Sequence, residues 1–185
     1  MSASDKTHPL GALRVFLQAR RQDTPAVAGL VVALSGGPDS LTLLLAAAQI
    51  APAEGLRLRA LHVHHGLHAD ADAWAAQAQA QARAVATDCQ VLRVTVPAVA
   101  SVEGAARAAR YAALAAALAP DEALLLAHHQ DDQAETLLLR LMRGAGLHGL
   151  AGMRPVSSWR GADGREIPRW RPWLDLAAAC GGLPA

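Results

Sequence analysis

The sequence predicts an α/β protein with a parallel sheet and helices on both faces. Short apolar runs alternate with longer helix-forming stretches, and polar clusters come directly after the apolar runs. A strand that is apolar throughout is typical of a parallel sheet, where both faces are buried. With 185 residues, 52% of them hydrophobic, the chain is most simply one domain over 1–185. Because aromatic residues make up only 3%, Leu, Val and Ala must fill the core.

The elements follow in order along the chain. Residues 1–28 hold an opening helix and a lead-in, and the helix ends near a Thr-Pro break at residue 24. Glycine, proline and tryptophan dominate after Gly144, so residues 144–185 are expected to form an irregular tail with a short segment near 168–174. The predicted strands are residues 30–34, 57–63, 90–96 and 122–127, and the later predicted helices are residues 41–48, 69–86, 101–118 and 130–143.

The loop after the first strand reads Ser35-Gly36-Gly37-Pro38-Asp39-Ser40. Its glycines allow unusual backbone angles, while Pro38, Asp39 and Ser40 suit the start of a helix. Free N–H groups at that helix start would attract an anion. A Walker loop would need a lysine here, and a dinucleotide fingerprint would need glycine at Ser40. A carboxylate beside polyphosphate implies Mg²⁺, although an ordinary strand-turn-helix corner is the simpler alternative.

A second polar cluster, His128-His-Gln-Asp-Asp-Gln-Ala-Glu135, begins where the fourth strand ends. Asp132 and Glu135 are one turn apart on the expected helix, with leucines and Met142 on its apolar side. The cluster could form a metal-hydrolase centre, surround a triphosphate held by the loop, or simply complement a helix N-terminus. The first loop is expected at the same edge of the sheet, which favours the triphosphate.

Two further groups stand out. The dense histidines of residues 62–68 are not expected to form a metal site, since His62 and His64 share a strand face and His65 points away. His65 with Gly66 is better interpreted as part of a loop covering a nucleotide.

Glu103, Arg107 and Arg110 share one side of a helix and could form a solvated ion-pair stripe or bind phosphate. Arg140 and Arg143 could be favourable helix-end charges or RNA contacts.

The spelling of the loop resembles that of the N-type ATP pyrophosphatases, the PP-loop superfamily, which split ATP into AMP and pyrophosphate. Three longer segments resemble the bacterial tRNA(Ile)-lysidine synthetases: 62–67, 103–111 and 127–153. Arg171-Pro-Trp-Leu174 is similar to the Arg-Pro-Leu-Leu of that family. The similarity extends from Gly29 to the C-terminus, and it implies a Rossmann-like adenine-nucleotide alpha-hydrolase-type fold.

The resemblance also implies a reaction and its partners. ATP would adenylate the C2 oxygen of the wobble cytidine in isoleucine tRNA, and the amine of free L-lysine would then displace AMP. Residues 35–40 and His65 would bind ATP, and Asp39 and Asp132 would hold Mg²⁺. His128 and Glu135 would shape the nucleotide and cytidine pocket. Arg107 and Arg110 would contact phosphate or the adenylated base.

Composition sets further expectations. A net charge of +1 gives no strong global attraction to RNA, so an RNA surface would be a local arginine patch. Cys89 and Cys180 form no CxxC pair, which argues against a thiolation relative with its paired cysteines. No signal peptide or long apolar run appears, so a cytoplasmic location is expected, with no membrane contact. A homodimer is left open.

The chain also departs from the family pattern. It has His64, Gly104 and Trp173 where the family often has Asn, Ala and Leu. Family members usually continue into domains that grip the tRNA, and those C-terminal domains are expected to be absent here. An ATP-binding module without turnover is therefore a further alternative.

Overall fold

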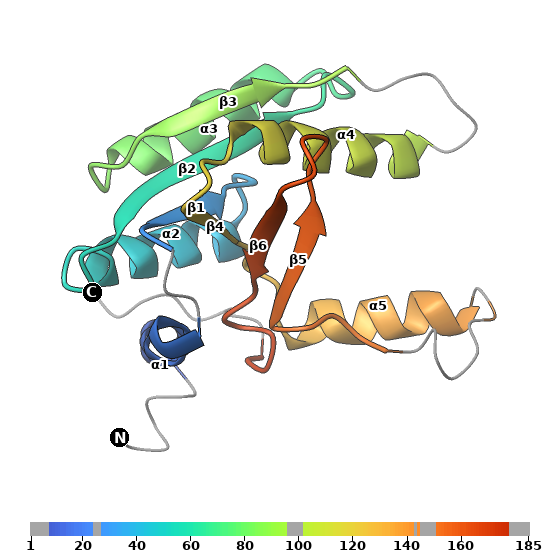
Figure 1. The fold of residues 1–185 in the computed structure, drawn as a ribbon. Coiled ribbons are helices and arrows are strands. Elements are labelled where there is room, and N and C mark those ends of the chain that lie inside the picture. Colours follow the sequence, from blue (N-terminus) through green and yellow to red (C-terminus); the bar gives the residue numbers. More distant parts are fainter. Residues whose placement is uncertain (1–7, 24–26, 96–101, 143, 145–150, 178–185) are drawn as a thin grey trace.

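The computed structural model describes residues 8–23, 27–95, 102–142, 144 and 151–177 (Figure 1). Helices and strands alternate as the sequence predicted, and most boundaries agree within a few residues. The helices are α1 (Pro9–Asp23), α2 (Pro38–Ile50), α3 (Ala71–Arg83), α4 (Val102–Ala117) and α5 (Gln130–Met142). The strands are β1 (Gly29–Ala33), β2 (Arg57–His64), β3 (Cys89–Arg93), β4 (Glu122–Leu125), β5 (Val156–Arg160) and β6 (Glu166–Trp170).

The strands form one sheet in the order β3-β2-β1-β4-β6-β5. All neighbouring pairs are parallel except β5 with β6. The chain runs outward from β1 through β2 to β3, and then crosses to place β4 on the other side of β1. This reversal is a topological switch point, where the carboxyl ends of parallel strands leave a crevice for a ligand. The expected parallel α/β fold is thus confirmed.

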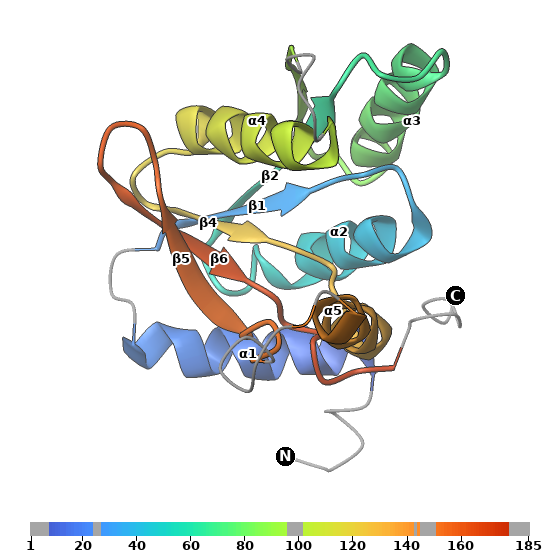
Figure 2. The same ribbon diagram turned by 90° about the vertical axis from the view of Figure 1, so that its right-hand side faces the viewer.

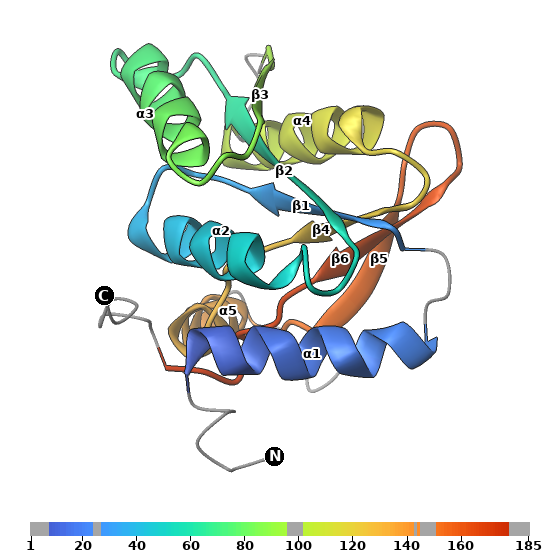
Figure 3. The same cartoon turned by 90° about the vertical axis from the view of Figure 1, so that its left-hand side faces the viewer.

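Two apolar clusters cover the two faces of the sheet. One joins β1, β2 and β4 to α1, α2 and α3, and the other joins β1, β2, β4 and β6 to α4. Figures 2 and 3 show α2 and α4 on opposite faces. Leu30, Val31 and Val32 are fully buried because β1 is covered on both sides. Small alanines let the helices lie close to the sheet, including Ala46, Ala47, Ala78 and Ala82, all with 0% exposure.

The region after Gly144 is more regular than the sequence indicated. We expected an irregular tail, but β5 and β6 form an antiparallel hairpin, and β6 adds to the parallel sheet beside β4. The two strands were hard to recognise because apolar and polar residues do not alternate in β5, which reads Val-Ser-Ser-Trp-Arg, and because Pro168 lies within β6. After the hairpin, the indole of Trp173 is buried and donates to the carbonyl of Pro9 at 2.9 Å.

Helix α5 differs from the prediction in its packing. Its leucines and Met142 were expected to supply an apolar side, yet none of its residues is buried, and Met142 is 84% exposed. Figure 1 shows α5 extending away from the sheet. Gln133 ties its first turns to the segment before β5, since its amide donates to and accepts from the backbone of Met153. Arg140 donates to the Ala151 carbonyl, and Arg143 lies outside the described residues.

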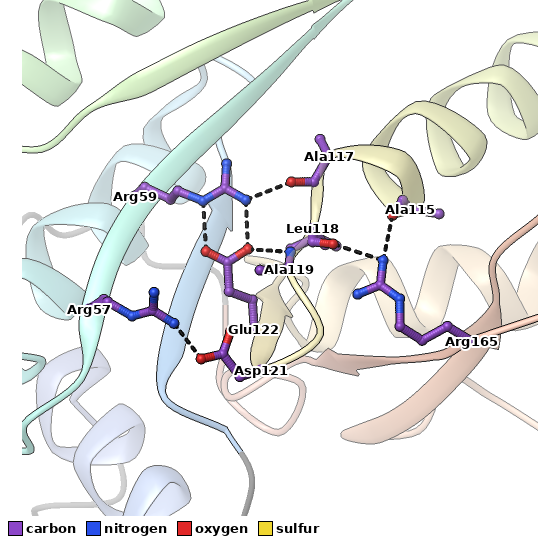
Figure 4. A network of polar contacts seen from close by, with 9 residues as sticks. All are labelled: Arg57, Arg59, Ala115, Ala117, Leu118, Ala119, Asp121, Glu122 and Arg165. Carbon is purple, nitrogen blue, oxygen red and sulfur yellow. Dashed lines mark hydrogen bonds and ion pairs between the residues drawn. The ribbon is translucent and has the colours of Figure 1, made fainter. Parts of the chain in front are cut away.

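A polar network closes the opposite edge of the sheet, at the amino ends of the strands (Figure 4). Arg59 on β2 donates to both carboxylate oxygens of Glu122 at 2.7 and 2.6 Å, and to the carbonyl of Ala117 at 2.8 Å. Arg165 donates to two further carbonyls at the end of α4. Two guanidinium groups therefore bind the negative end of the α4 dipole.

Among the described residues, no helix has the length and apolarity needed to cross a membrane.

Candidate functional site

A cavity of about 500 Å³ lies at the switch point. That volume is in the range of small-molecule sites. Val32 of β1 pairs with Leu125 of β4. Ser35 and His128, each three residues further along the chain, therefore follow the carboxyl ends of neighbouring strands. The cavity is lined by the predicted site residues Ser35, Asp39, Ser40, His65, Arg110, His128 and Asp132.

The loop between β1 and α2 is held by its two serines. Their hydroxyls are 3.0 Å apart, and the Ser40 hydroxyl accepts from the Ser35 N–H at 3.1 Å. The Gly37 N–H donates to the Ser35 hydroxyl at 3.3 Å. Gly36 has φ of +92°, a conformation that residues with a Cβ rarely adopt. The loop thus folds tightly over its own side chains, and Gly36 is the residue that permits it.

The N-terminus of α2 faces this loop without a side-chain cap. Gly37 is the N-cap, Pro38 occupies the first helical turn, and the described residues provide no side-chain cap hydrogen bond. The uncapped N–H groups and the positive end of the helix dipole suit an anionic ligand. This arrangement has the features that the sequence predicted for an anion site.

Two glutamines of α3, which the sequence analysis did not single out, contact the loop. The side-chain amides of Gln81 and Gln77 lie 3.3 and 3.5 Å from the carbonyl oxygen of Gly36. In a trans peptide the carbonyl and the following N–H point in opposite directions. The two amides therefore favour one orientation of the peptide between Gly36 and Gly37. In that orientation the Gly37 N–H points away from α3 and toward Ser35. Their spacing of four residues on one helix face could have indicated a shared contact, but not its partner.

Asp39 and Asp132 come from different helices and converge on one imidazole. Nε2 of His129 lies 3.6 Å from a carboxylate oxygen of Asp39 and 3.5 Å from one of Asp132. The backbone N–H of His129 also donates to Asp132 at 2.8 Å. Carboxylate oxygens are hard ligands, and Mg²⁺ is usually held by one or two of them together with phosphates and waters. The donor set therefore fits Mg²⁺. Within the described ranges, no group of three or more His, Cys, Asp or Glu side chains is arranged to hold a metal ion by itself.

His128 is partly buried, beside a residue to which the sequence analysis gave no role. Nε of Arg171 donates to its Nδ1 at 3.0 Å. Burial, followed by the charge of Arg171, lowers the pKa of His128 to about 4. Burial also lowers the pKa of Arg171, to about 10. At neutral pH the pair is therefore a neutral imidazole and a charged guanidinium.

The histidines at the end of β2 all line the cavity. His62 is fixed by a 2.8 Å contact between its Nδ1 and the Leu34 carbonyl, and His64 contacts Asp72 and Arg93. The expectation that His65 points away rested on strand alternation, which does not extend to His65 because β2 ends at His64. Burial lowers the pKa of His65, with help from the charge of Arg110. The apolar rim includes Leu67 and Trp74.

Five predicted site residues do not line the cavity: Gly36, Gly37, Pro38, Arg107 and Glu135. Arg107 lies one turn before Arg110, with its guanidinium 5.3 Å from the centre of the Tyr111 ring. Arg169 and Arg110 approach the same ring at 5.3 and 5.8 Å. In the described part of the chain these three arginines form no ion pair, so the patch keeps its positive charge. Glu135 is exposed on α5, and the side chain of Glu103 lies outside the described residues.

Three known tRNA(Ile)-lysidine synthases are similar to this chain. The identity is 46% over 176 residues with that of Bordetella parapertussis, covering 92% of this chain and 49% of that protein. It is 51% over 157 residues with that of Xanthomonas campestris pv. campestris, covering 82% and 34%. It is 53% over 171 residues with that of Ralstonia nicotianae, covering 89% and 36%. The chain spans about half the length of the first relative and about a third of the others.

The fold also resembles a solved structure, the U34-tRNA thiolase NcsA from Methanococcus maripaludis with its [4Fe-4S] cluster. The TM-score is 0.60 at 14% identity, covering 89% of this chain and 60% of that chain. At this identity the likeness concerns the fold alone. A family model, the PP-loop domain, matches residues 14–180 and thus includes every residue of the cavity. The sequence match, the loop geometry and the sheet topology agree, and the chain belongs to the PP-loop family.

Proposed function

We propose that this chain carries out the chemistry of a tRNA(Ile)-lysidine synthase. One observation carries the proposal: about half of the residues are identical to proteins of that name over most of the chain. The cavity adds support, because an anion-binding loop, two carboxylates and the partly buried His128 meet in it. ATP would bind there, with its phosphates at the N-terminus of α2.

Asp39 and Asp132 would hold Mg²⁺, which supplies positive charge to neutralise the triphosphate. The C2 oxygen of the wobble cytidine would attack the α-phosphate of ATP, and pyrophosphate would leave. The amine of free lysine would then attack C2 and displace AMP. Such a sequence depends on positioning and charge neutralisation rather than on a protein nucleophile. The loop, the carboxylates and Arg110 are suited to those two tasks.

The arginine patch supports an RNA substrate. Arg107, Arg110 and Arg169 surround Tyr111 near the cavity and keep their charge available. Guanidinium groups bind phosphates in a bidentate manner, and an adjacent aromatic ring can contact a base. We expect the anticodon phosphates at this patch. The same reaction would take place in the cytoplasm, and a homodimer stays an expectation.

A thiolation reaction is the second candidate, suggested by the fold similarity. Thiolate ligands are needed for an iron–sulfur cluster. Cys89 begins β3 and therefore lies at the amino end of the strands, opposite the cavity. Burial raises the pKa of its thiol, which lowers its reactivity. Cys180 lies outside the described residues. The position of Cys89 thus favours the lysine-joining reaction.

The test is to incubate the chain with ATP, Mg²⁺, labelled lysine and isoleucine tRNA. The lysidine synthase of Ralstonia nicotianae is the positive control. We expect label in the RNA and release of pyrophosphate. Pyrophosphate release without label would exclude lysine as the substrate but keep the adenylation, whereas an absence of ATP binding would contradict both reactions.

A matched pair of variants tests the carboxylates. Asp132→Ala should abolish most Mg²⁺-dependent turnover, because Asp132 lines the cavity. Asp131→Ala removes an equal charge from the exposed neighbouring position and should retain activity. Equal losses in the two variants would show that the helix charge, rather than a metal ligand, is responsible.

A further inference from the structure

Arg171 is a buried cation with unusual partners. Its side chain is 4% exposed. It donates to Nδ1 of His128 at 3.0 Å, to the carbonyl of Arg154 at 2.9 Å and to the hydroxyl of Ser157 at 3.1 Å. None of these acceptors is charged, and among the described residues no carboxylate pairs with it. A buried charge is normally paired with an opposite charge. Arg171 is therefore costly to the fold, and such costs concentrate at functional positions.

The contact between Arg171 and His128 determines a proton position. A guanidinium has five N–H donors and no acceptor. Nδ1 of His128 must therefore be the acceptor, without a proton. In a neutral imidazole one nitrogen carries hydrogen, so the proton is on Nε2. His128 lines the cavity, and in the described part of the chain its Nε2 has no recorded hydrogen-bond partner. Nε2–H is thus the group available to a ligand.

We propose that Arg171 is a positioning residue that holds His128 as a neutral Nε2–H donor toward an anionic or carbonyl oxygen of the bound substrate. The ligand identity rests on the proposed function: the oxygen belongs to an ATP phosphate or to the cytidine C2 carbonyl. The lowered pKa of His128 agrees with this role, because an imidazole with a pKa of about 4 stays neutral at pH 7. His128 then acts as a hydrogen-bond donor and not as a general acid or base.

Arg171 reaches His128 only through the tertiary fold. The two residues are 43 positions apart in the sequence. Arg171 directly follows β6, the strand that pairs with β4. The Arg171 N–H also donates to the carbonyl of Pro155 at 2.8 Å, which fixes the backbone at this point. Ser157 on β5 accepts from the same guanidinium. The hairpin thus has a function at the site, because it supports the residue that orients His128.

The first measurement is the tautomer of His128 in the wild-type chain, by long-range ¹H–¹⁵N NMR of the imidazole without added ligand. We expect an unprotonated Nδ1 and a protonated Nε2. His128→Ala identifies the signals. A protonated Nδ1 would overturn the proposal. This result is independent of lysine and tRNA, so it stands or falls separately from the proposed function.

The second measurement is a double-mutant cycle of Arg171→Met and His128→Ala. Each variant is first checked by thermal unfolding. Each should reduce ATP-dependent adenylation by roughly 10-fold to 100-fold, as for loss of a hydrogen bond involving a charged group. In the His128→Ala background, Arg171→Met should cause no further loss. Full additivity of the two losses would refute the coupling.

Arg169→Met is the matched control for the spectrum, because Arg169 precedes Arg171 by two residues and has no recorded contact with His128. Its His128 signals should match those of the wild type, whereas Arg171→Met should shift the Nδ1 signal. Calorimetry with ATP and Mg²⁺ distinguishes the two possible ligand oxygens, that of an ATP phosphate and that of the cytidine C2 carbonyl. Weaker ATP binding in Arg171→Met assigns the phosphate, and unchanged ATP binding with slower RNA-dependent adenylation assigns the cytidine oxygen. A shift of equal size in Arg169→Met would contradict the proposed contact.

Discussion

Replacing Arg59 with methionine should destabilise the protein far more than the same change at Arg57. The two arginines are two residues apart on β2, and their partners, Glu122 and Asp121, are adjacent. Glu122 is 7% exposed and Arg59 26%, whereas Arg57 and Asp121 are 63% and 43% exposed. The pairs thus differ mainly in burial. Methionine preserves the apolar stem and removes the charge.

The size of each stability loss follows from the partners that the carboxylate keeps after its arginine is replaced. Without Arg59, the Ala119 N–H, at 2.8 Å, is the one hydrogen-bond donor left to the buried carboxylate among the described residues. Removing one partner of a buried pair costs about 3–5 kcal/mol, and the partial exposure of Arg59 places this case near the lower value. An exposed pair contributes at most about 1 kcal/mol. For a chain of this size, a loss of about 3 kcal/mol lowers Tm by roughly 6–12 °C.

The assay is chemical unfolding of wild type and variants at pH 7, with Tm as a second readout. Adding Glu122→Gln to Arg59→Met should recover part of the loss, because it removes the uncompensated charge. Equal, small effects of Arg59→Met and Arg57→Met would refute the reasoning, since they would show that Glu122 is well solvated without its partner.

The pH dependence provides an independent check on the same pair. The hydrogen bond from Arg59 lowers the pKa of Glu122 below its usual value of 4.5. The resulting stability is therefore complete above about pH 4.5 and is lost as the pH falls through the lowered pKa. Without Arg59, burial would favour the protonated acid. The stability difference between wild type and Arg59→Met should consequently narrow below pH 4.5 and stay constant near neutrality.

Three further predictions concern the site. Gly36→Ala should impair ATP binding and lower the free energy of unfolding by about 1–3 kcal/mol, because Gly36 has a positive φ. Gly37→Ala should unfold like the wild type, because Gly37 has a φ of −79°. Equal stability of the two variants would contradict the backbone argument. Asp39→Ala should shift the Mg²⁺ dependence of adenylation by at least roughly 10-fold to 100-fold without changing Tm, and unchanged magnesium titrations would exclude Asp39 as a ligand. Arg110→Met should weaken ATP binding more than Arg107→Met, as measured by calorimetry, since only Arg110 lines the cavity; the reverse order would place the phosphates outside it.

Much of the site could be predicted because its signals are local. The loop at 35–40 combines a strand end, paired glycines and a helix start within six residues, and the structure confirms each part. Asp132 follows β4, another apolar strand, in the same way. Parallel strands present their carboxyl ends at one edge, so the sequence indicated that these two segments would meet.

The errors have a physical pattern as well. The hairpin of β5 and β6 was missed because β5, an exposed strand at the edge of the sheet, carries little apolar periodicity, and because Pro168 interrupts the pattern of β6. The apolar side of α5 was expected to pack, but periodicity reports an amphipathic helix without saying what covers it.

The sequence by itself determined the fold class, the loop, and the carboxylates and histidine that follow the strands, since each depends on neighbouring residues. Only the tertiary structure decided which distant side chains support them. Arg171 reaches His128 across 43 residues, and Gln77 and Gln81 reach Gly36 from another helix. Such contacts depend on sheet order and register, which local sequence does not encode. The same holds for Asp39 and Asp132, whose carboxylates meet at His129 because β1 and β4 are neighbours at the switch point.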